Sequence, residues 1–386
     1  MQISAKCHII FAMSKEKNNN MCDYVLWRGD LPFSESPFNE VDAMIFSQLS
    51  YLHFDGLISD NIKDKIKLSE LSRLFMESPD FETRKQNGPL INEDTVSLLG
   101  IAGNSIRFGQ CELCAFVDKV DVAQEEQFSA LSVFLDDDTV FIAYRGTHEE
   151  IIGWKEDLNM AFETPVPAQI EAVKYLEMIA GSTNRKIRTG GHSKGGNLAL
   201  YAAAFCEKSA KKKILRVYNN DGQGFDEKIL ESAEYMEIQD RIQTILPQNS
   251  MVGILLPHKG QIRIVESSNS SLMQHDGFSW EVLGTSFVTV EERSPQSLFF
   301  EKAVQEWLER LDTNRKREAI NTLFDIIGVS GASTLTEFQE NWFKSSPKII
   351  KYLKEIDRQK KKDMNDFFKI FIESEKYSLL HKIEKL

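Results

Sequence analysis

The stretch GGHSKGGNLALYAAAF, residues 190–205, constrains the fold of this chain more than any other segment. It follows KIRTG, which we expect to be a short strand, and it continues into an alanine-rich apolar run that predicts a buried helix. Residues 191–195 fit the pattern G-x-S-x-G, in which a serine lies on the tight turn between a strand and a helix. Glycines on both sides allow close backbone packing around such a turn, because they carry no Cβ atom.

Two other interpretations of this stretch compete with a serine that carries chemistry. One is an ordinary glycine-rich loop between a strand and a helix, which the five-residue pattern alone leaves open. The other is a phosphate-binding loop, G-x-x-x-x-G-K-[ST], which requires a lysine directly after Gly195. The residue at that position is Gly196, so the spacing excludes a phosphate-binding loop.

The patterns around this turn predict an α/β fold with a mostly parallel central sheet. Residues 22–114 read as a mainly helical segment, in which NEVDAMIFSQLSYL has apolar residues at helical spacing. FSALSVFL and TVFIAYRGT then predict an antiparallel pair of strands. PAQIEAVKYLEMIAG predicts an amphipathic helix with Ile170, Val173, Leu176 and Ile179 on its apolar side. Further strands are expected at KILRVYNN, QTILP, VGILL and IRIVES. Strands that alternate with helices favour a parallel sheet.

The pattern changes after Pro295, where almost every segment reads as helix. The expected helices cover residues 296–311, 315–328, 335–344 and 348–376. The sequence therefore predicts three parts, namely a disordered N-terminus (1–21), an α/β domain (22–294) and a helical C-terminal module (295–386).

Charge and cysteine content narrow the partners and the compartment. The net charge of −12 argues against nucleic acid and against anionic membranes as partners. No run of 18 apolar residues exists, so we expect no transmembrane segment. Five sparse cysteines favour reduced thiols and a cytoplasmic protein. The lone pair Cys111 and Cys114 lacks a second ligand pair for zinc, and we expect neither a metal nor a cofactor.

A serine on such a turn becomes a nucleophile only when a histidine takes its proton and a third group orients that histidine. Three histidines follow Ser193 in the chain, which are His258, His275 and His381. His275 lies in the loop after the last expected strand, where the base of such a site belongs, so it is the expected base. The alternative is a loop histidine that only bonds the backbone.

The acid and the oxyanion donors are predicted from neighbouring segments. Asp221 ends the strand that follows the nucleophile helix and is the expected acid, whereas Asp276 is too close to His275 in sequence to reach its ring. The alternative for Asp221 is that it only holds its glycine-rich turn. The oxyanion hole is expected to comprise the backbone N–H of Lys194 and the backbone N–H and hydroxyl of Thr147.

Three further residues lie in the segment that follows Thr147. We expect His148 to line the entrance of the site, but it precedes Ser193, which is the wrong order for the base. Trp154 and Asp157 are expected to pack and to pin the loop.

Together, YRGT, WKEDL and GHSKGG resemble the class 3 lipase-like α/β-hydrolases, and NNDGQGF and QHDGFSW are closer to the bacterial Mbeg-like branch, a domain of unknown function. The resemblance covers about residues 22–290. It implies an α/β-hydrolase fold, with Ser193 as nucleophile and Thr147 and Lys194 at the oxyanion hole. Class 3 lipases carry their acid in an Asp-Ile-Val-Pro-like segment, and the matching stretch here begins with Ser250. Either Asp221 provides the acid or the triad is incomplete.

The sequence thus predicts a serine hydrolase that cleaves small-molecule or lipid carboxylic esters through an acyl-enzyme. The alternative is a catalytically weak or inactive protein that uses a hydrolase fold for binding or as a scaffold. The separation between Asp221 and His275 discriminates between the two, because an active triad needs them within hydrogen-bond reach. The oligomeric state stays open.

Overall fold

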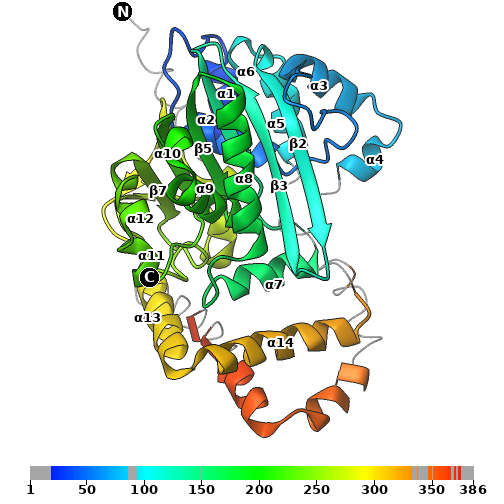
Figure 1. The fold of residues 1–386 in the computed structure, drawn as a ribbon, viewed down its shortest axis with the longest axis vertical. Helices are drawn as coiled ribbons and strands as arrows, with labels where there is room; N and C mark the ends of the chain where they lie inside the picture. Colours follow the sequence, from blue (N-terminus) through cyan, green and yellow to red (C-terminus); the bar gives the residue numbers. More distant parts are fainter. Residues whose placement is uncertain are drawn as a thin grey trace, which may run out of the picture.

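The computed structural model describes residues 19–85, 94–148, 150–332, 337, 347–349, 351–366, 369–370 and 373–374. Its centre is a nine-stranded mixed sheet with the order β1-β2-β3-β4-β5-β6-β7-β8-β11 (Figure 1). Neighbouring strands are parallel from β4 to β8 and antiparallel on both sides of this block. The strands are β1 (Ile66–Lys67), β2 (Glu112–Asp121), β3 (Glu126–Phe134), β4 (Thr139–Tyr144), β5 (Lys186–His192), β6 (Ile214–Asn220), β7 (Ile242–Pro247), β8 (Gln261–Val265) and β11 (Thr289–Val290), and β9 (Val282–Leu283) pairs separately with β10 (Ser286–Phe287).

Helices cover both faces of the sheet, so its central strands are buried on both sides. In β4, Phe141 and Ala143 face one apolar cluster, whereas Val140, Ile142 and Tyr144 face the other, as the two-residue period of a strand requires. The first cluster is formed with the N-terminal helices and the second with α8 and α9. Figure 1 shows α8 and α9 in front of the sheet and the N-terminal helices behind it and at its edge.

The helices on the N-terminal side begin at well-capped positions. Asn20 and Asn39 each accept backbone N–H groups at the start of α1 and α2 and complete capping boxes with acidic residues three positions later. Every residue of α2 is buried, because this helix lies between the sheet and the other N-terminal helices. These helices are α1 (Met21–Arg28), α2 (Glu40–Leu49), α3 (Leu68–Met76), α4 (Phe81–Arg84), α5 (Asp94–Gly103) and α6 (Ile106–Gly109).

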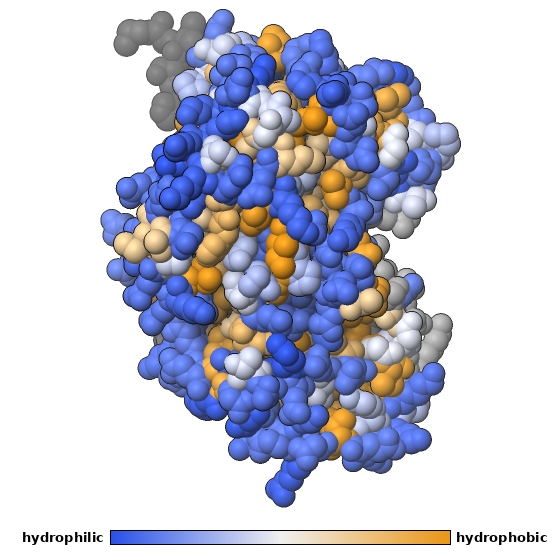
Figure 2. Space-filling view, in the orientation of Figure 1, coloured by the Kyte–Doolittle hydropathy of each residue, from blue (hydrophilic) through white to orange (hydrophobic). Residues whose placement is uncertain are grey.

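The remaining helices of the α/β domain connect successive strands. They are α7 (Ile151–Asn159), α8 (Pro167–Ser182), α9 (Lys194–Phe205), α10 (Lys208–Lys211), α11 (Glu227–Leu230), α12 (Ala233–Met236), η1 (Gln239–Arg241), η2 (Ser271–His275) and η3 (Gly277–Ser279). In the described part of the chain, none of the helices combines the length and the hydrophobicity needed to span a bilayer. The face in Figure 2 is largely hydrophilic, with hydrophobic residues in small separate groups.

The C-terminal helices pack on the α/β domain through an apolar cluster. Phe300, Val304 and Trp307 of α13 (Pro295–Arg310) share this cluster with Leu246 and Met251 from the end of β7 and the loop that follows it. The next helix, α14 (Thr313–Val329), contacts α7 and lies below it in Figure 1. Further helical residues lie within 347–374, with an interruption at 356–357 inside the expected helix 348–376. The expected helix 335–344 lies outside the described residues except for residue 337.

Most of the predicted elements are confirmed, including the helical lead-in, the antiparallel β3–β4 pair and the strands β5 to β8. The predicted strand VGILL is wrong, because residues 252–256 form turns whose Ile254 packs into the cluster with α13. On the predicted apolar side of α8, Leu176 and Ile179 are buried as expected, whereas the prediction for Ile170 is wrong, because it is 44 % exposed and the buried face runs through Ala172 instead.

The predicted disordered N-terminus is partly wrong. Asn20 caps α1, and Met21 is completely buried as the first residue of that helix. Residues 1–18 lie outside the described part of the chain. Cys111, Cys114 and Cys206 are buried and form no disulfide bond within the described part of the chain, and the prediction of reduced thiols stays a prediction.

Candidate active site

Ser193 lies on a strained turn between β5 and α9. Its backbone has φ 57° and ψ −134°, a conformation that residues with a Cβ atom rarely adopt. We call this turn, residues 191–195, the elbow. A Cβ atom at Gly191 or Gly195 would overlap main-chain atoms, since the elbow packs directly against itself and against Tyr144. The Ser193 N–H donates to the carbonyl of Asn220 at 2.9 Å, which fixes the turn against the end of β6. The glycine pattern therefore has a steric cause.

Asp221 and His275 form a direct hydrogen bond beside this turn. The His275 Nδ1 atom lies 2.6 Å from Asp221 Oδ2, and the Asp221 side chain is completely buried. Because a carboxylate only accepts hydrogen bonds, Nδ1 carries the proton and Nε2 is the ring nitrogen that can accept one. The predicted acid and base are thus in contact, although 54 residues separate them in the chain.

The other oxygen of Asp221 is held by the loop that follows β7. Ser250 Oγ donates to Asp221 Oδ1, and the Gly253 N–H donates to the same oxygen at 3.2 Å. His258 Nε2 donates in turn to the Gly253 carbonyl at 2.6 Å, and burial lowers the pKa of His258, which favours its neutral form. The loop that begins at Ser250 therefore has no acid of its own at this place but holds the carboxylate of Asp221, which follows β6.

The main chain brings Ser193 to this pair. Asn220, whose carbonyl accepts the Ser193 N–H, directly precedes Asp221, and the imidazole of His192 stacks on that of His275 with ring centroids 4.5 Å apart. Ser193 is 7 % exposed, and the His275 side chain is 19 % exposed. The structure thus places the three predicted residues in one cluster at the carboxyl ends of β5 and β6.

Lys194 follows Ser193 and begins α9, so its backbone N–H belongs to the first turn, where helical N–H groups have no intrahelical acceptor. Its side chain does not point into solvent. The ammonium group forms a buried ion pair with Glu156 on α7 and donates to the Gln127 carbonyl at 2.9 Å. This ion pair fixes α7 against the elbow.

Thr147 lies in the loop after β4, and its neighbour Gly146 packs directly against the His192 carbonyl. The Thr147 hydroxyl donates to Asp157 on α7, so the prediction that this hydroxyl is available to an oxyanion is wrong, and the role of the backbone N–H stays a prediction. Burial raises the pKa of Asp157 to about 6, against smaller opposing effects of Lys194 and of the Thr147 hydrogen bond. His148, expected near the entrance, is instead buried with 2 % exposure.

An apolar cavity of about 440 Å³ opens at Ser193. It lies between the α/β domain and the C-terminal helices, because α7, the loop after β7 and α14 all contribute to its wall. Apart from Ser193 and Lys194 at the elbow, its polar lining consists of Asp157 and Gln223, and the rest comprises Trp154, Leu158, Met251, Val252, Leu255, Leu272, Leu323, Phe324 and Ile327.

Comparison with protein families gives one assignment. The Mbeg1-like family model matches residues 102–325, which is more than half of the chain. The chain belongs to the Mbeg1-like family. No curated protein is significantly similar to it. The Mbeg1-like match includes Thr147, Ser193, Asp221 and His275. It begins later than the resemblance predicted from the motifs, inside α5, and it runs past Pro295 into α14.

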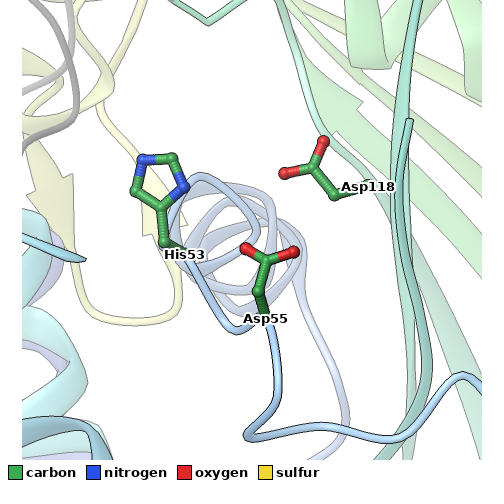
Figure 3. A group of neighbouring side chains, drawn as sticks. All are labelled: His53, Asp55 and Asp118. Atoms are coloured by element: carbon green, nitrogen blue, oxygen red, sulfur yellow. The ribbon is translucent and has the colours of Figure 1, made fainter. Parts of the chain in front are cut away.

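One group of side chains in this Mbeg1-like protein has the composition of a metal site. The ligand atoms of His53, Asp55 and Asp118 lie within 4.8 Å of one another (Figure 3). Both oxygens of Asp118, however, accept from the Arg145 guanidinium at 2.6 Å. A cation at this place would lie beside that guanidinium, and the ion pair already accounts for the position of Asp118.

Sequence reasoning missed several residues of the Mbeg1-like site. Ser250 was recognised only as a missing acid, and Asp157 only as a residue that pins its loop. His192 fills a variable position of G-x-S-x-G, and the pattern assigns it no role. The apolar residues of α14 recur at helical spacing, which indicates that one face of this helix is buried. Periodicity does not reveal what that face packs against, so the position of α14 beside Ser193 was not predicted.

Proposed function

We propose that this Mbeg1-like protein is a serine hydrolase with a class 3 lipase-like α/β-hydrolase fold that cleaves carboxylic esters through an acyl-enzyme. The observation that carries the proposal is the 2.6 Å hydrogen bond between His275 Nδ1 and Asp221, beside a serine held on a strained turn. A buried carboxylate that fixes the tautomer of a histidine next to such a serine is the arrangement that nucleophilic catalysis needs.

In the first half of the proposed reaction, Ser193 Oγ attacks the ester carbonyl carbon while His275 Nε2 takes the hydroxyl proton. Asp221 stabilises the imidazolium that forms. The carbonyl oxygen gains a negative charge and accepts hydrogen bonds from the backbone N–H groups of Lys194 and Thr147. When the tetrahedral intermediate collapses, the carbon–oxygen bond to the alcohol breaks, and the alcohol leaves with the proton from His275.

The second half returns the enzyme to its starting state. His275 Nε2 takes a proton from a water molecule, which attacks the acyl carbon bound to Ser193. The collapse of this second tetrahedral intermediate releases a carboxylic acid and returns the proton to Ser193 Oγ. Each step uses the same base and the same oxyanion donors, so the site needs no further group.

The lining of the cavity favours an acyl chain as the part of the substrate that binds there. Its wall is almost entirely aliphatic and aromatic, and its volume lies in the range of cavities that hold drug-sized ligands. A chain in this cavity would contact Leu158 of α7 and Phe324 of α14 and would leave its carbonyl at Ser193. We therefore propose esters with an apolar acyl group, from lipids or acylated metabolites.

Turnover of p-nitrophenyl esters with acyl chains of increasing length tests this proposal. Ser193→Ala is expected to lower kcat by several orders of magnitude, because no nucleophile remains. Ser132→Ala is the matched control, since Ser132 is likewise a buried serine but lies in β3, where its hydroxyl forms a hydrogen bond with Tyr175. Absence of turnover by the folded wild type, or equal turnover by Ser193→Ala, contradicts the proposal and favours a non-catalytic binding or scaffold protein.

A further inference from the structure

His192, the residue before Ser193, makes two buried hydrogen bonds that bear on the base. Its Nε2 atom lies 2.7 Å from the backbone carbonyl oxygen of His275, and its Nδ1 atom lies 3.1 Å from the Tyr51 hydroxyl. A carbonyl oxygen can only accept, so Nε2 carries the proton of the neutral ring and Nδ1 accepts from Tyr51. The tautomer of His192 is therefore fixed from both sides.

The environment keeps this imidazole uncharged. Burial, with a smaller contribution from the neighbouring His275 ring, lowers the pKa of His192 well below its usual value. The two rings lie against each other with an interplanar angle of 33°, and His192 and Trp280 meet in a T-shaped arrangement. A neutral ring can lie against His275 when that residue becomes an imidazolium, whereas a charged ring would repel it.

The main chain of the base is held at two successive carbonyls. Trp280 Nε1 donates to the Gln274 carbonyl at 2.8 Å, and His192 Nε2 donates to the next carbonyl, that of His275. The segment consists of short 3-10 turns, which have few backbone hydrogen bonds of their own, and Asn269 Nδ2 also donates to the Met273 carbonyl at 3.0 Å. His192 connects it directly to the elbow, since His192 and Ser193 are neighbours in one turn.

We propose that His192 is a positioning residue that holds His275 at a fixed distance from Ser193, with Tyr51 fixing its tautomer. This inference rests on the proposed function. Asp221 fixes the direction of the His275 ring, and His192 fixes the position of the main chain that carries it. General-base catalysis needs the nitrogen within hydrogen-bond reach of the hydroxyl, and a displacement of about 1 Å lowers rates by up to about 10²-fold.

Two substitutions separate the hydrogen bond from the packing. His192→Phe keeps a buried ring against His275 but removes the N–H donor. His192→Gln places an amide N–H donor near the position of Nε2 and removes the ring. We expect His192→Phe to lower kcat by about 10- to 100-fold with little change in KM, and His192→Gln to recover a large part of this loss. Tyr51→Phe is expected to cause a smaller loss, since the His275 carbonyl still favours the Nε2–H tautomer.

A second measurement does not depend on turnover. The His275 Nδ1 proton, in its hydrogen bond to Asp221, is expected to give a low-field proton NMR resonance. This resonance should broaden or disappear in His192→Phe and persist in His192→Gln. An unchanged resonance and an unchanged kcat in His192→Phe overturn the inference, as do equal losses in both variants. If the wild type turns over no ester but the resonance still depends on His192, the proposed function is refuted and the positioning role is retained.

Discussion

Asp221→Asn is the substitution for which the structure predicts the most specific effect. Asp221 Oδ1 accepts two hydrogen bonds, from Ser250 Oγ and from the Gly253 N–H, whereas Oδ2 accepts one, from His275. An asparagine keeps its carbonyl oxygen where two donors point, so its NH₂ group must face His275. The imidazole then has to accept at Nδ1, which moves its proton to Nε2. In that tautomer His275 cannot take a proton from Ser193.

The magnitude follows from the number of functions that are lost. The variant loses the correct tautomer and also the negative charge that stabilises the imidazolium. In the Ser-His-Asp template, the corresponding change costs about 10⁴-fold in kcat. We expect a loss between about 10²- and 10⁴-fold, which corresponds to about 3–5 kcal/mol in activation free energy. The fold should change little, because an asparagine has the same shape and keeps both hydrogen bonds at Oδ1.

The assay is kcat/KM for ester hydrolysis together with the thermal midpoint, measured for Asp221→Asn and for Ser250→Ala. Ser250→Ala removes one of the two donors to Oδ1 but leaves the His275 contact, so its kcat/KM should stay within about tenfold of the wild type. A near-wild-type rate for Asp221→Asn would refute the assignment of the acid. If kcat/KM of Asp221→Asn falls only in proportion to the fraction of folded protein, Asp221 stabilises its turn and is not the acid.

Three further predictions concern stability, selectivity and organisation. The pKa of Asp157 is raised from 3.8 to about 6, so the folded protein binds more protons than the unfolded chain between these values, and stability should fall as the pH rises through this window. In denaturant titrations, Asp157→Asn should reduce the change of the free energy of unfolding across this window by up to about 3 kcal/mol. The same pH dependence in the wild type and in Asp157→Asn would contradict the raised pKa. Phe324→Ala enlarges the cavity at α14 and should shift the preference for p-nitrophenyl esters towards longer acyl chains, whereas an unchanged profile places the chain elsewhere. Limited proteolysis should cleave the described helices after Pro295 no faster than the α/β domain, because Phe300 and Trp307 are buried against it, and rapid loss of α13 and α14 from an intact domain contradicts this packing.

The elbow was predictable because its constraints are local. A serine at positive φ with close packing on both sides needs glycines at Gly191 and Gly195, and both appear in the sequence as a pattern. The chain order of Ser193, Asp221 and His275, the residues of the proposed triad, was also predictable, since each follows an identifiable strand. The parallel pairing of β4, β5, β6 and β7 was predictable because these strands alternate with helices in the sequence.

The contacts that complete the site depend on long-range packing. Ser250 and Asp221 lie 29 residues apart, and no spacing rule connects a donor in one loop with a carboxylate in another. The Thr147 hydroxyl was expected at the oxyanion hole, but it donates a hydrogen bond to Asp157 on the next helix. The apolar run VGILL packs against α13 through Ile254 and does not form a strand. A short apolar run alone does not distinguish a buried strand from a buried loop, so the sequence predicted the strand wrongly.

Covalent labelling with a fluorophosphonate tests the central claim most directly, since this reagent reacts with a serine that a neighbouring base activates. The folded wild type is incubated with the probe, and the modified peptide is identified by mass spectrometry. The proposed function predicts one modified residue, Ser193, with labelling that is lost in Ser193→Ala and slowed in Asp221→Asn. No labelling of the folded protein, or equal labelling of Ser193→Ala, would contradict a Ser193–His275–Asp221 hydrolase.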